Sequence, residues 1–436
     1  MSDSFTGLTH IATCDLGGVC RGRAVPNSDS ERWDREGTGW VPASIAMSPL
    51  GHIVEGNSFA AIGDLRLIPD PTTRCELPSI RNKPAVSLVL GDLVTTGGGE
   101  WHCSSRTFLR RAVSELADST GLTLLAAFEH EFTLVDEEAP SSPLSLQSLR
   151  HVEPFGSDLV RCLALAGLQP EAWHPEYGSH QWEITVAPTD AAAAADRAIL
   201  LREIVRFVAD AHERHVTFAP VPDDGPVGNG VHVHLSLRNA DGSSATFDPA
   251  APGRLSALAE SFAAGILEHA SAITAITAPS PLSALRLRPG RWSAASADVG
   301  YQDRESMLRI CPALDLPGSS PIDHLNIEYR AADATANPWL VMGVLIKAGL
   351  EGIRRELRIN DPTRVAPPTD SSERSRSLAL PASLRESLVA LESDDIVLGW
   401  FPPELIATYL LVKQNEELET AGTSIEDLRL LYSRLY

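Results

Sequence analysis

The sequence predicts an α+β protein, in which an antiparallel sheet carries one polar face and helices pack on the other face. Two patterns support this prediction. Several segments alternate polar and apolar residues with the period of a strand, and long segments of helical spacing follow them. Short strand-like segments give way to longer helices near residue 105. We therefore expect a small β-rich domain, residues 1–104, and a larger domain, residues 105–436.

The strands expected in the N-terminal domain are short, and glycines and prolines separate them. Turns are predicted at Asp70-Pro71 and at Asn82-Lys83-Pro84, because proline and asparagine favour turn conformations. The predicted strands span residues 10–15, 52–54, 64–68 and 85–90.

The larger domain is expected to alternate between strands and longer amphipathic helices. Asp190 stands where an N-cap is needed, and Thr423 and Glu426 have the spacing of a capping box. A polar loop is predicted around residues 371–376. The predicted helices span residues 106–119, 156–166, 191–215, 254–277 and 337–357, followed by four shorter ones, and the predicted strands span residues 122–135, 180–186, 231–237 and 325–331.

The composition excludes several classes of partner. The net charge of −21 argues against nucleic acid or an anionic membrane as the main partner. The sequence shows no run of about 18 apolar residues and no signal-peptide pattern, so we expect neither a transmembrane helix nor secretion. The six cysteines are scattered without the spacing of a zinc site, which favours reduced thiols and a cytoplasmic protein.

The polar face of the predicted sheet carries unusual residues. Glu129 and Glu131 point to the same side of the buried strand 122–135, where two carboxylates are costly unless a cation lies near them. Same-face positions lie about 6.5–7 Å apart, so each carboxylate could serve a different cation. His232 and His234 share a face of another predicted strand in the same way.

Six residues together indicate a site for divalent cations. A single glutamate on a strand is most often a solvated surface residue, and a single histidine is more often hydrogen bonded than a ligand. The joint appearance of these residues on four strand or strand-edge segments favours a metal site. Five carboxylates and one imidazole suit Mg²⁺ or Mn²⁺ better than structural zinc. The candidates are Glu129, Glu131, Glu176, Glu183, His232 and Glu328.

A second group of candidates consists of arginines, which suit bidentate capture of phosphate and carboxylate. Several arginines beside a carboxylate-rich sheet, in a chain of net charge −21, indicate an anionic substrate. The alternative interpretation of any one of them is a salt bridge to a surface acid. The candidates are Arg286, Arg288, Arg291, Arg304, Arg309 and Arg330.

Eight motifs occur in an order that, taken together, is highly specific. They are CDLGGVCRGRAVP, VEGNSFAAIGDLRLIPDP, FEHEF, HPEYGSHQWEI, VGNGVHVHLSL, RLRPGRW, DRESMLRI and IEYRAADATANPWL. Through them the sequence resembles the glutamine synthetase family nearly from end to end.

The resemblance implies a β-grasp N-terminal domain and a catalytic domain with a curved antiparallel sheet backed by helices. It also implies homo-oligomers, with active sites between neighbouring subunits of hexameric rings that stack as a dodecamer. The implied reaction uses ATP and two or more Mg²⁺ or Mn²⁺ ions. ATP phosphorylates a carboxylate, usually the γ-carboxylate of glutamate, and an amine then displaces phosphate from the acyl phosphate to form an amide.

The resemblance also implies roles for individual residues. Arg304 and Arg309 match arginines that contact the phosphates, Arg330 matches one near the acceptor carboxylate, and Arg286 matches one that holds the amino-acid carboxylate. The implied metal ligands are Glu131, Glu176 and Glu183 for the first cation and Glu129, His232 and Glu328 for the second; His234 and Ser236 would contact the nucleotide, and Asn229 and Gly230 the amino-acid substrate.

Departures from the family pattern concern the amine. Trp292 stands where true glutamine synthetases carry a glutamate that binds and deprotonates ammonium. Tryptophan cannot act as a base, although its face attracts cations. The glutamate-binding loop is shortened to residues 227–230, and Glu55 aligns with the aspartate of the ammonium site. These changes resemble the divergent γ-glutamyl–amine ligases of the family, with Trp292 forming part of an amine pocket.

Three alternatives stay open at this stage. The chain could be an ordinary glutamine synthetase that accepts ammonium. It could activate an analogue of glutamate, since the shortened loop leaves the acid undefined. It could also be a non-catalytic homologue that keeps only the ring, although all six candidate metal ligands are present.

Overall fold

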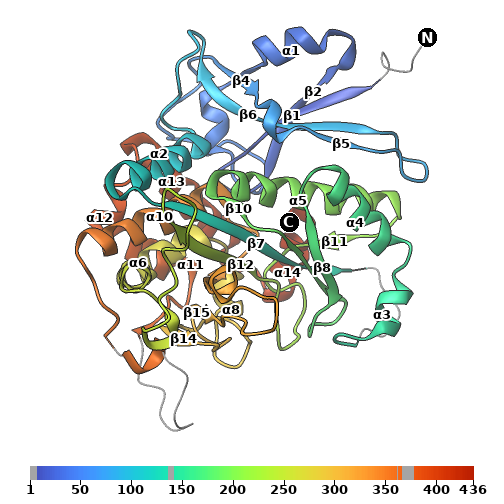
Figure 1. The fold of residues 1–436 in the computed structure, drawn as a ribbon. Coiled ribbons are helices and arrows are strands. Elements are labelled where there is room, and N and C mark those ends of the chain that lie inside the picture. Colours follow the sequence, from blue (N-terminus) through green and yellow to red (C-terminus); the bar gives the residue numbers. More distant parts are fainter. Residues whose placement is uncertain (1–6, 136–141, 361, 366–377) are drawn as a thin grey trace.

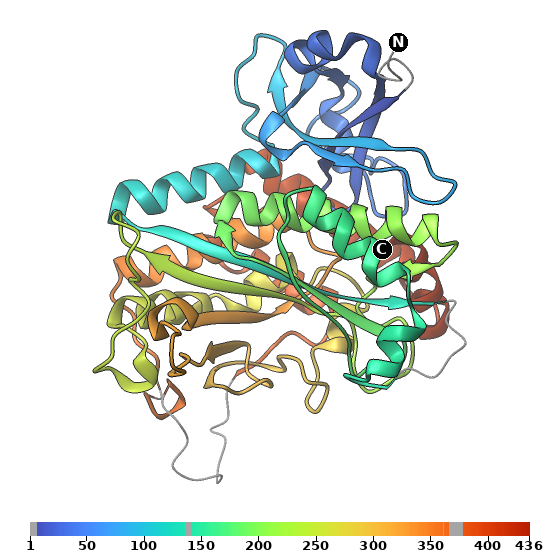
Figure 2. The same cartoon turned by 45° about the vertical axis from the view of Figure 1, so that its right-hand side comes forward.

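The computed structural model describes residues 7–135, 142–360, 362–365 and 378–436, and the loop predicted around residues 371–376 lies outside them. A small N-terminal part lies above helices of a larger body that contains the main sheet (Figures 1 and 2). None of the helices formed by the described residues is long and apolar enough to cross a membrane.

The N-terminal part is built on a six-stranded sheet in the order β2-β1-β6-β4-β3, with β5 beside β6. Its centre is a parallel pair, β1 and β6, whereas the other pairs are antiparallel, as expected for a β-grasp sheet. The elements are β1 (Leu8–Cys14), β2 (Cys20–Pro26), α1 (Ser30–Glu36), β3 (Thr38–Trp40), β4 (Leu65–Pro69), β5 (Cys75–Leu77) and β6 (Val86–Thr95).

Three of the four strands predicted here are confirmed, and the strand predicted at residues 52–54 is wrong. That segment makes only an isolated bridge between Met47 and Ile53. β2, β3 and β5 were not predicted from the sequence. β2 is mostly exposed along its length and β3 and β5 have three residues each, so none shows a long apolar alternation.

The larger part contains a nine-stranded sheet in the order β14-β15-β16-β12-β7-β9-β8, with β10 and β11 also paired to β7. All its pairs are antiparallel except β14 with β15. The strands are β7 (Thr123–Leu134), β8 (Pro170–Pro175), β9 (Gln181–Val186), β10 (Thr189–Asp190), β11 (Val216–Thr217), β12 (Val231–Arg238), β14 (Val299–Tyr301), β15 (Leu308–Cys311) and β16 (Asn326–Ala332); β13 (Ser296–Ala297) and β17 (Leu378–Ala379) form a separate pair.

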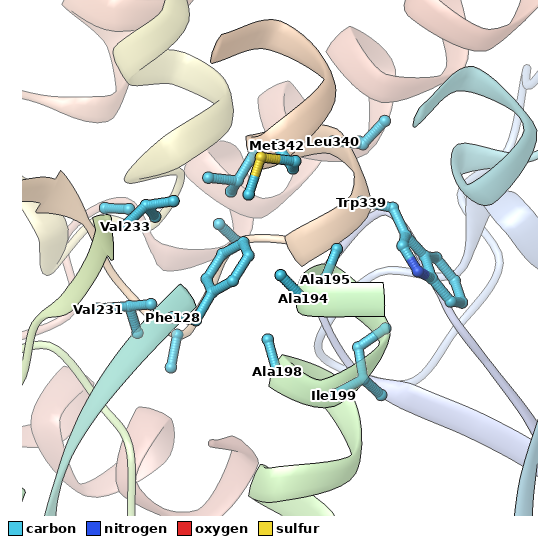
Figure 3. Packing of buried hydrophobic residues seen from close by; sticks show 14 of the residues in the cluster. Phe128, Ala194, Ala195, Ala198, Ile199, Val231, Val233, Trp339, Leu340 and Met342 are labelled. Atoms are coloured by element: carbon cyan, nitrogen blue, oxygen red, sulfur yellow. The ribbon is translucent and has the colours of Figure 1, made fainter. Parts of the chain in front are cut away.

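Helices cover the apolar face of this sheet. α5 (Ala191–Ala211) packs on β7, and α10 (Pro338–Arg354) packs against α5, α2 (Ser105–Thr120) and α6 (Ala257–Glu268). Figure 3 shows the contact, where small alanines of α5 let this helix approach the sheet closely. The side chains that meet there include Phe128, Val231 and Val233 from the sheet, Ala194, Ala195, Ala198 and Ile199 from α5, and Trp339, Leu340 and Met342 from α10.

The remaining helices are spread around the larger body, with α3 and α8 in its lower part and α4 and α12 at its sides (Figure 1). They are α3 (Leu146–His151), α4 (Phe155–Leu165), α7 (Ala270–Thr277), α8 (Ser283–Arg286), α9 (Pro321–His324), α11 (Leu384–Glu392), α12 (Asp395–Leu398), α13 (Pro403–Thr420) and α14 (Ile425–Leu435).

Two helix predictions differ from the structure, one in continuity and one in the N-cap. The helix predicted over residues 254–277 is two helices, α6 and α7, which meet at His269. The Nδ1 atom of His269 lies 2.7 Å from Oδ2 of Asp394, a contact with a distant segment that sequence spacing does not reveal. The capping box predicted at Thr423 is wrong by one residue, because the hydroxyl of Ser424 accepts the hydrogen bond from Asp427 N.

Asn337 joins the two parts of the molecule. Its buried Oδ1 accepts hydrogen bonds from Trp339 N at 2.9 Å and Leu340 N at 3.3 Å, and so caps α10. Its Nδ2 donates to the carbonyl oxygens of Cys14 at 3.2 Å and Asp15 at 3.0 Å, at the end of β1. One side chain therefore fixes both the start of α10 and the N-terminal sheet.

Replacing Asn337 by Ala should lower the thermal stability more than replacing Ser383, the partly exposed N-cap of α11. Loss of a cap costs about 1 kcal/mol in either case. Asn337→Ala also leaves buried carbonyl groups unsatisfied, at about 1–3 kcal/mol more. Scanning fluorimetry of both variants compares their Tm values. Equal losses would show that the contacts of Asn337 with β1 contribute nothing.

Candidate active site

Strand pairing brings the predicted carboxylates together on the polar face of the large sheet. β7 pairs with β9 on one side and with β12 on the other, so Glu131 lies opposite Glu183 and Glu129 lies opposite His232. β16 continues the sheet beyond β12 and adds Glu328 to the same face. The alternation of side chains along β7 is therefore what gathers the candidate ligands.

These residues form two neighbouring groups. In one, His232 Nδ1 lies 2.7 Å from Glu129 Oε1 and 3.6 Å from Glu328 Oε1. In the other, His174 Nε2 lies 2.9 Å from Glu176 Oε1 and 3.5 Å from Glu183 Oε1. His174 was not predicted, although its spacing of two from Glu176 in the same motif could have indicated a shared face.

Glu131 lies between these groups and is held in place by the ends of neighbouring strands. Its Oε2 accepts hydrogen bonds from Gly230 N at 2.6 Å and from Gln181 Nε2 at 3.2 Å. A Cβ atom at Gly230 would lie only 3.0 Å from Arg286 Nη1 and from His232 Nε2. A side chain at this position would crowd Arg286 and His232, so a glycine allows the site to pack closely.

The carboxylates have very different electrostatic surroundings. Burial raises the pKa of Glu183 to about 11, and the neighbouring carboxylates of Glu129, Glu131 and Glu176 add to this effect. Burial also raises the pKa of Glu131. Buried carboxylates that repel one another are stabilised when a divalent cation binds between them. Oxygen donors of this kind suit Mg²⁺ or Mn²⁺.

The group of Glu129, His232 and Glu328 already has positive charge beside it. Burial of Glu328 opposes ionisation, but Arg330, His234 and His232 outweigh it and lower its pKa to about 2. Arg309 Nη1 donates to Glu328 Oε2 at 2.6 Å, and Arg330 Nη1 pairs with the other oxygen. Glu328 therefore stays ionised and is held by two arginines in addition to its histidine neighbours.

Two cavities open on either side of the Glu129–His232 pair. The first cavity, of about 340 Å³, is lined by the group of His174, Glu176 and Glu183 and by cationic and aromatic side chains. The other cavity, of about 370 Å³, is lined by Glu129 and by residues that are mostly uncharged. The first includes Glu131, His174, Glu176, Tyr177, Glu183, His232, Arg286, Arg291, Trp292, Arg304 and Arg330, and the other includes Leu125, Ala127, Glu129, His234, Ser236 and Asn326.

The predicted arginines occupy different places in the site. Arg304 and Arg291 line the first cavity, as does the buried Arg286, whose Nη2 donates to Ala332 O at 2.7 Å. Arg330 lines it too and reaches across to the loop that carries Trp292, donating from Nη2 to the carbonyl of that residue at 3.0 Å. Arg309 contacts Glu328 and lines neither cavity.

Trp292 forms an aromatic edge to the first cavity. Its ring centroid lies 4.7 Å from that of Tyr177, and 49% of the residue is exposed. Its backbone has a φ of 55°, and Glu305 stabilises this turn by accepting hydrogen bonds from Trp292 N at 2.9 Å and Gly290 N at 3.1 Å. Glu305 and Tyr177 were both missed from sequence, since only the folded chain brings them to the turn.

Three other candidates are placed less directly. Asn229 is buried, and its Nδ2 donates to Ala219 O at 3.0 Å, so it supports the strand ends and lines neither cavity. Ser236 lines the other cavity, and its hydroxyl donates to Leu325 O at 3.2 Å. Glu55 is exposed on the N-terminal part and lies outside both cavities of its own chain.

Comparison with known proteins shows the family. The glutamine synthetase catalytic-domain model matches residues 102–432, and the glutamine synthetase N-terminal-domain model matches residues 5–101. The chain belongs to the glutamine synthetase family. It is therefore a ligase that forms a carbon–nitrogen bond, and family members use ATP and divalent metal ions.

Curated relatives include enzymes named for different amines. The chain is 32% identical to the gamma-glutamylpolyamine synthetase GlnA3 of Streptomyces coelicolor, over 98% of this chain and 93% of that protein. It is 29% identical to a glutamate–isopropylamine ligase of Pseudomonas, over 92% and 90% of the two chains. It is also 31% identical to the glutamine synthetase of Thermus thermophilus, over 92% and 90%.

Solved structures show the same fold. A crystal structure described as a novel glutamine synthase homolog superposes with a TM-score of 0.92 and 41% identity, covering 99% of both chains. A ligand-free GmaS structure superposes with a TM-score of 0.80 and 25% identity, covering 98% of this chain and 96% of that one. The predicted α+β architecture, with a small N-terminal domain and a glutamine synthetase catalytic domain, is confirmed.

Replacing Glu183 by Gln should separate metal binding from folding. The substitution removes one buried carboxylate but keeps its size, so the metal-free variant should melt at a higher temperature than the unmodified protein. The rise in Tm on adding Mg²⁺ or Mn²⁺ should shrink to less than half. Scanning fluorimetry with EDTA and with each metal measures both, and Glu392→Gln on α11 is the control. A full metal-dependent rise in Glu183→Gln would contradict the assignment.

Proposed function

We propose that the chain joins glutamate to an organic amine, in an ATP-dependent reaction that passes through a γ-glutamyl phosphate. The observation that carries this proposal is the aromatic pair of Trp292 and Tyr177 beside the carboxylate groups, at the position where ammonium-using relatives need a charged base. The faces of aromatic rings attract alkylammonium groups and pack against their carbon atoms.

The carboxylate groups supply the ligands for the metal ions. We assign Glu131, Glu176 and Glu183 to a first Mg²⁺ or Mn²⁺ and Glu129, His232 and Glu328 to a second. When bound, these ions neutralise the charge of the phosphates. Glu129 of the second set lines the cavity that contains His234 and Ser236, which we assign to the nucleotide.

The arginines in the first cavity, and Arg309 beside Glu328, match the remaining charges of the reaction. Arg286 and Arg330 would hold carboxylates of the amino acid, and Arg304 and Arg309 would stabilise the transferred phosphoryl group. An oxygen of the γ-carboxylate attacks the γ-phosphorus of ATP, and ADP leaves. The amine nitrogen then attacks the acyl carbon, the C–O bond to phosphate breaks, and the nitrogen loses a proton as the amide forms.

Relatives named for a polyamine and for isopropylamine support an organic amine as acceptor. Ordinary glutamine synthesis is the second candidate, because several relatives of comparable identity are glutamine synthetases. Trp292 disfavours it, since an indole can neither bind ammonium through opposite charge nor accept its proton.

We also propose that the active site is completed by a neighbouring subunit in a hexameric ring, stacked as a dodecamer. The exposed position of Glu55, away from both cavities of its own chain, supports a role in the site of a neighbour. Light scattering after size-exclusion chromatography tests the assembly. A monomer that retains full activity would contradict this part of the proposal.

Phosphate release from ATP, measured with glutamate and a panel of amines, tests the proposed activity. We expect release to depend on Mg²⁺ or Mn²⁺ and to be at least tenfold faster with one class of alkyl, polyamine or aromatic amine than with ammonium. Glu129→Gln should release no phosphate and serves as the control. Equal rates with ammonium would instead support glutamine synthesis, and release only with another acid would identify a different substrate.

Replacing Trp292 by Ala should raise the KM for the amine at least tenfold and leave the KM for ATP within about twofold. Glu305→Ala should produce a weaker change in the same direction, because it releases the turn that positions the indole. The matched control is Glu268→Ala on the surface of α6. Amine kinetics that are unchanged in Trp292→Ala would disprove the aromatic pocket.

A further inference from the structure

Cys311 lies beside the proposed nucleotide cavity, yet the proposed reaction makes no use of a thiol. It is the last residue of β15 and is 7% exposed. Its Sγ lies 3.4 Å from Glu328 Oε2, and Arg309 Nη1 lies 3.4 Å from the same sulfur. The pairing of β15 with β16, and of β16 with β12, brings this thiol close to His234.

His234 is held with one ring nitrogen on Asn326 and the other facing Glu129 and Cys311. Asn326 Nδ2 donates to His324 O at 2.9 Å, so Asn326 Oδ1 is the acceptor for His234 Nδ1, also at 2.9 Å. The other ring nitrogen, Nε2, lies 3.6 Å from Glu129 Oε2, and a metal ion that binds it would displace its proton to solvent. A hydrogen bond of this kind orients metal-binding histidines.

The three side chains converge closely enough for one cation to contact all of them. One ligand atom from each of His234, Cys311 and Glu328 lies within 4.8 Å of the other two. Zinc bond lengths of about 2.0–2.3 Å place tetrahedral donors roughly 3.3–3.8 Å apart. The distance of 3.4 Å between Cys311 Sγ and Glu328 Oε2 agrees with this spacing.

We propose that His234, Cys311 and Glu328 bind a borderline divalent cation of the zinc class at the edge of the nucleotide cavity. A thiolate together with an imidazole selects Zn²⁺ over Mg²⁺, which prefers oxygen ligands. The thiol loses its proton to solvent as the sulfur–metal bond forms, and Glu129 or water takes the fourth position. Burial raises the pKa of the Cys311 thiol, and the guanidinium of Arg309 offsets part of this effect. Arg309 Nη1 contacts both the sulfur and Glu328 Oε2, so it moves aside when the metal binds.

This site shares ligands with the catalytic metal set. Glu328, and also Glu129 if it takes the fourth position, cannot serve both ions in full. Occupancy by zinc should therefore inhibit turnover by competing with the magnesium-bound nucleotide. The inhibition rests on the proposed function, whereas the binding of the metal does not.

Titration of the metal-free, reduced protein with Co²⁺ tests the site, because a thiolate bound to Co²⁺ gives an intense near-ultraviolet charge-transfer absorption. The matched control is Cys103, which lies within 4.8 Å of potential ligand atoms of His102 and Glu404 in a separate, more exposed cluster. We expect the absorption in the unmodified protein and in Cys103→Ser, and its loss in Cys311→Ser. Added Zn²⁺ should abolish it by displacing cobalt.

Competition with a chelating dye measures the affinity for zinc. We expect Cys311→Ser to weaken binding at least tenfold, and Asn326→Ala to weaken it by roughly 10- to 100-fold because His234 loses its orienting partner. Circular dichroism checks that each variant folds, and Cys311→Ala provides a second variant. Cobalt absorption that persists in both Cys311 variants, is absent from the unmodified protein, or disappears in Cys103→Ser would overturn the proposal.

Inhibition is measured separately, as the zinc concentration that halves amine-dependent phosphate release at fixed Mg²⁺ and ATP. Cys311→Ser should need at least tenfold more zinc than the unmodified protein, each compared with its own rate without zinc. Equal sensitivity would overturn the inhibitory role. If no amine supports turnover, the proposed function fails while the cobalt and dye measurements still decide the metal site.

Discussion

The central constraint on this molecule is the repulsion among buried carboxylates on one face of its large sheet. Neighbouring positive groups offset this repulsion for some of the carboxylates and not for others. Glu328 is held by two arginines, and Glu129 is hydrogen bonded to histidine. Glu131 and Glu183 have much less compensation, and burial raises the pKa of both. This difference identifies the cavity around Glu131 and Glu183 as the place where a bound cation would contribute most to stability.

The same strands that carry these charges also build the core. Along β7 the carboxylates alternate with apolar side chains such as Phe128, which packs against α5 and α10 (Figure 3). A shift of register by one residue would place the carboxylates in the core and the aromatic rings in the cavities. Folding and site assembly therefore depend on one register, and the N-terminal sheet is joined to it through Asn337.

The sequence was sufficient where local patterns decide the structure. Alternation predicted the strands that carry Glu129, His232 and Glu328, and which of their residues share a face. It was not sufficient where contacts between distant segments decide. The hydrogen bonds of Glu305 to the turn at Trp292 and the division of a predicted helix at His269 follow from tertiary packing. The short or exposed strands of the N-terminal sheet were missed because they bury too few residues for a clear period.

We propose that the protein activates the γ-carboxylate of glutamate and transfers the γ-glutamyl group to an organic amine. Transfer of ¹⁸O from the γ-carboxylate of labelled glutamate to inorganic phosphate, followed by mass spectrometry together with the amide product, tests it most directly. We expect one ¹⁸O atom in each phosphate released and a γ-glutamyl amide of the amine, with little glutamine when ammonium replaces the amine. Unlabelled phosphate, or glutamine formed as fast as any other amide, would contradict it.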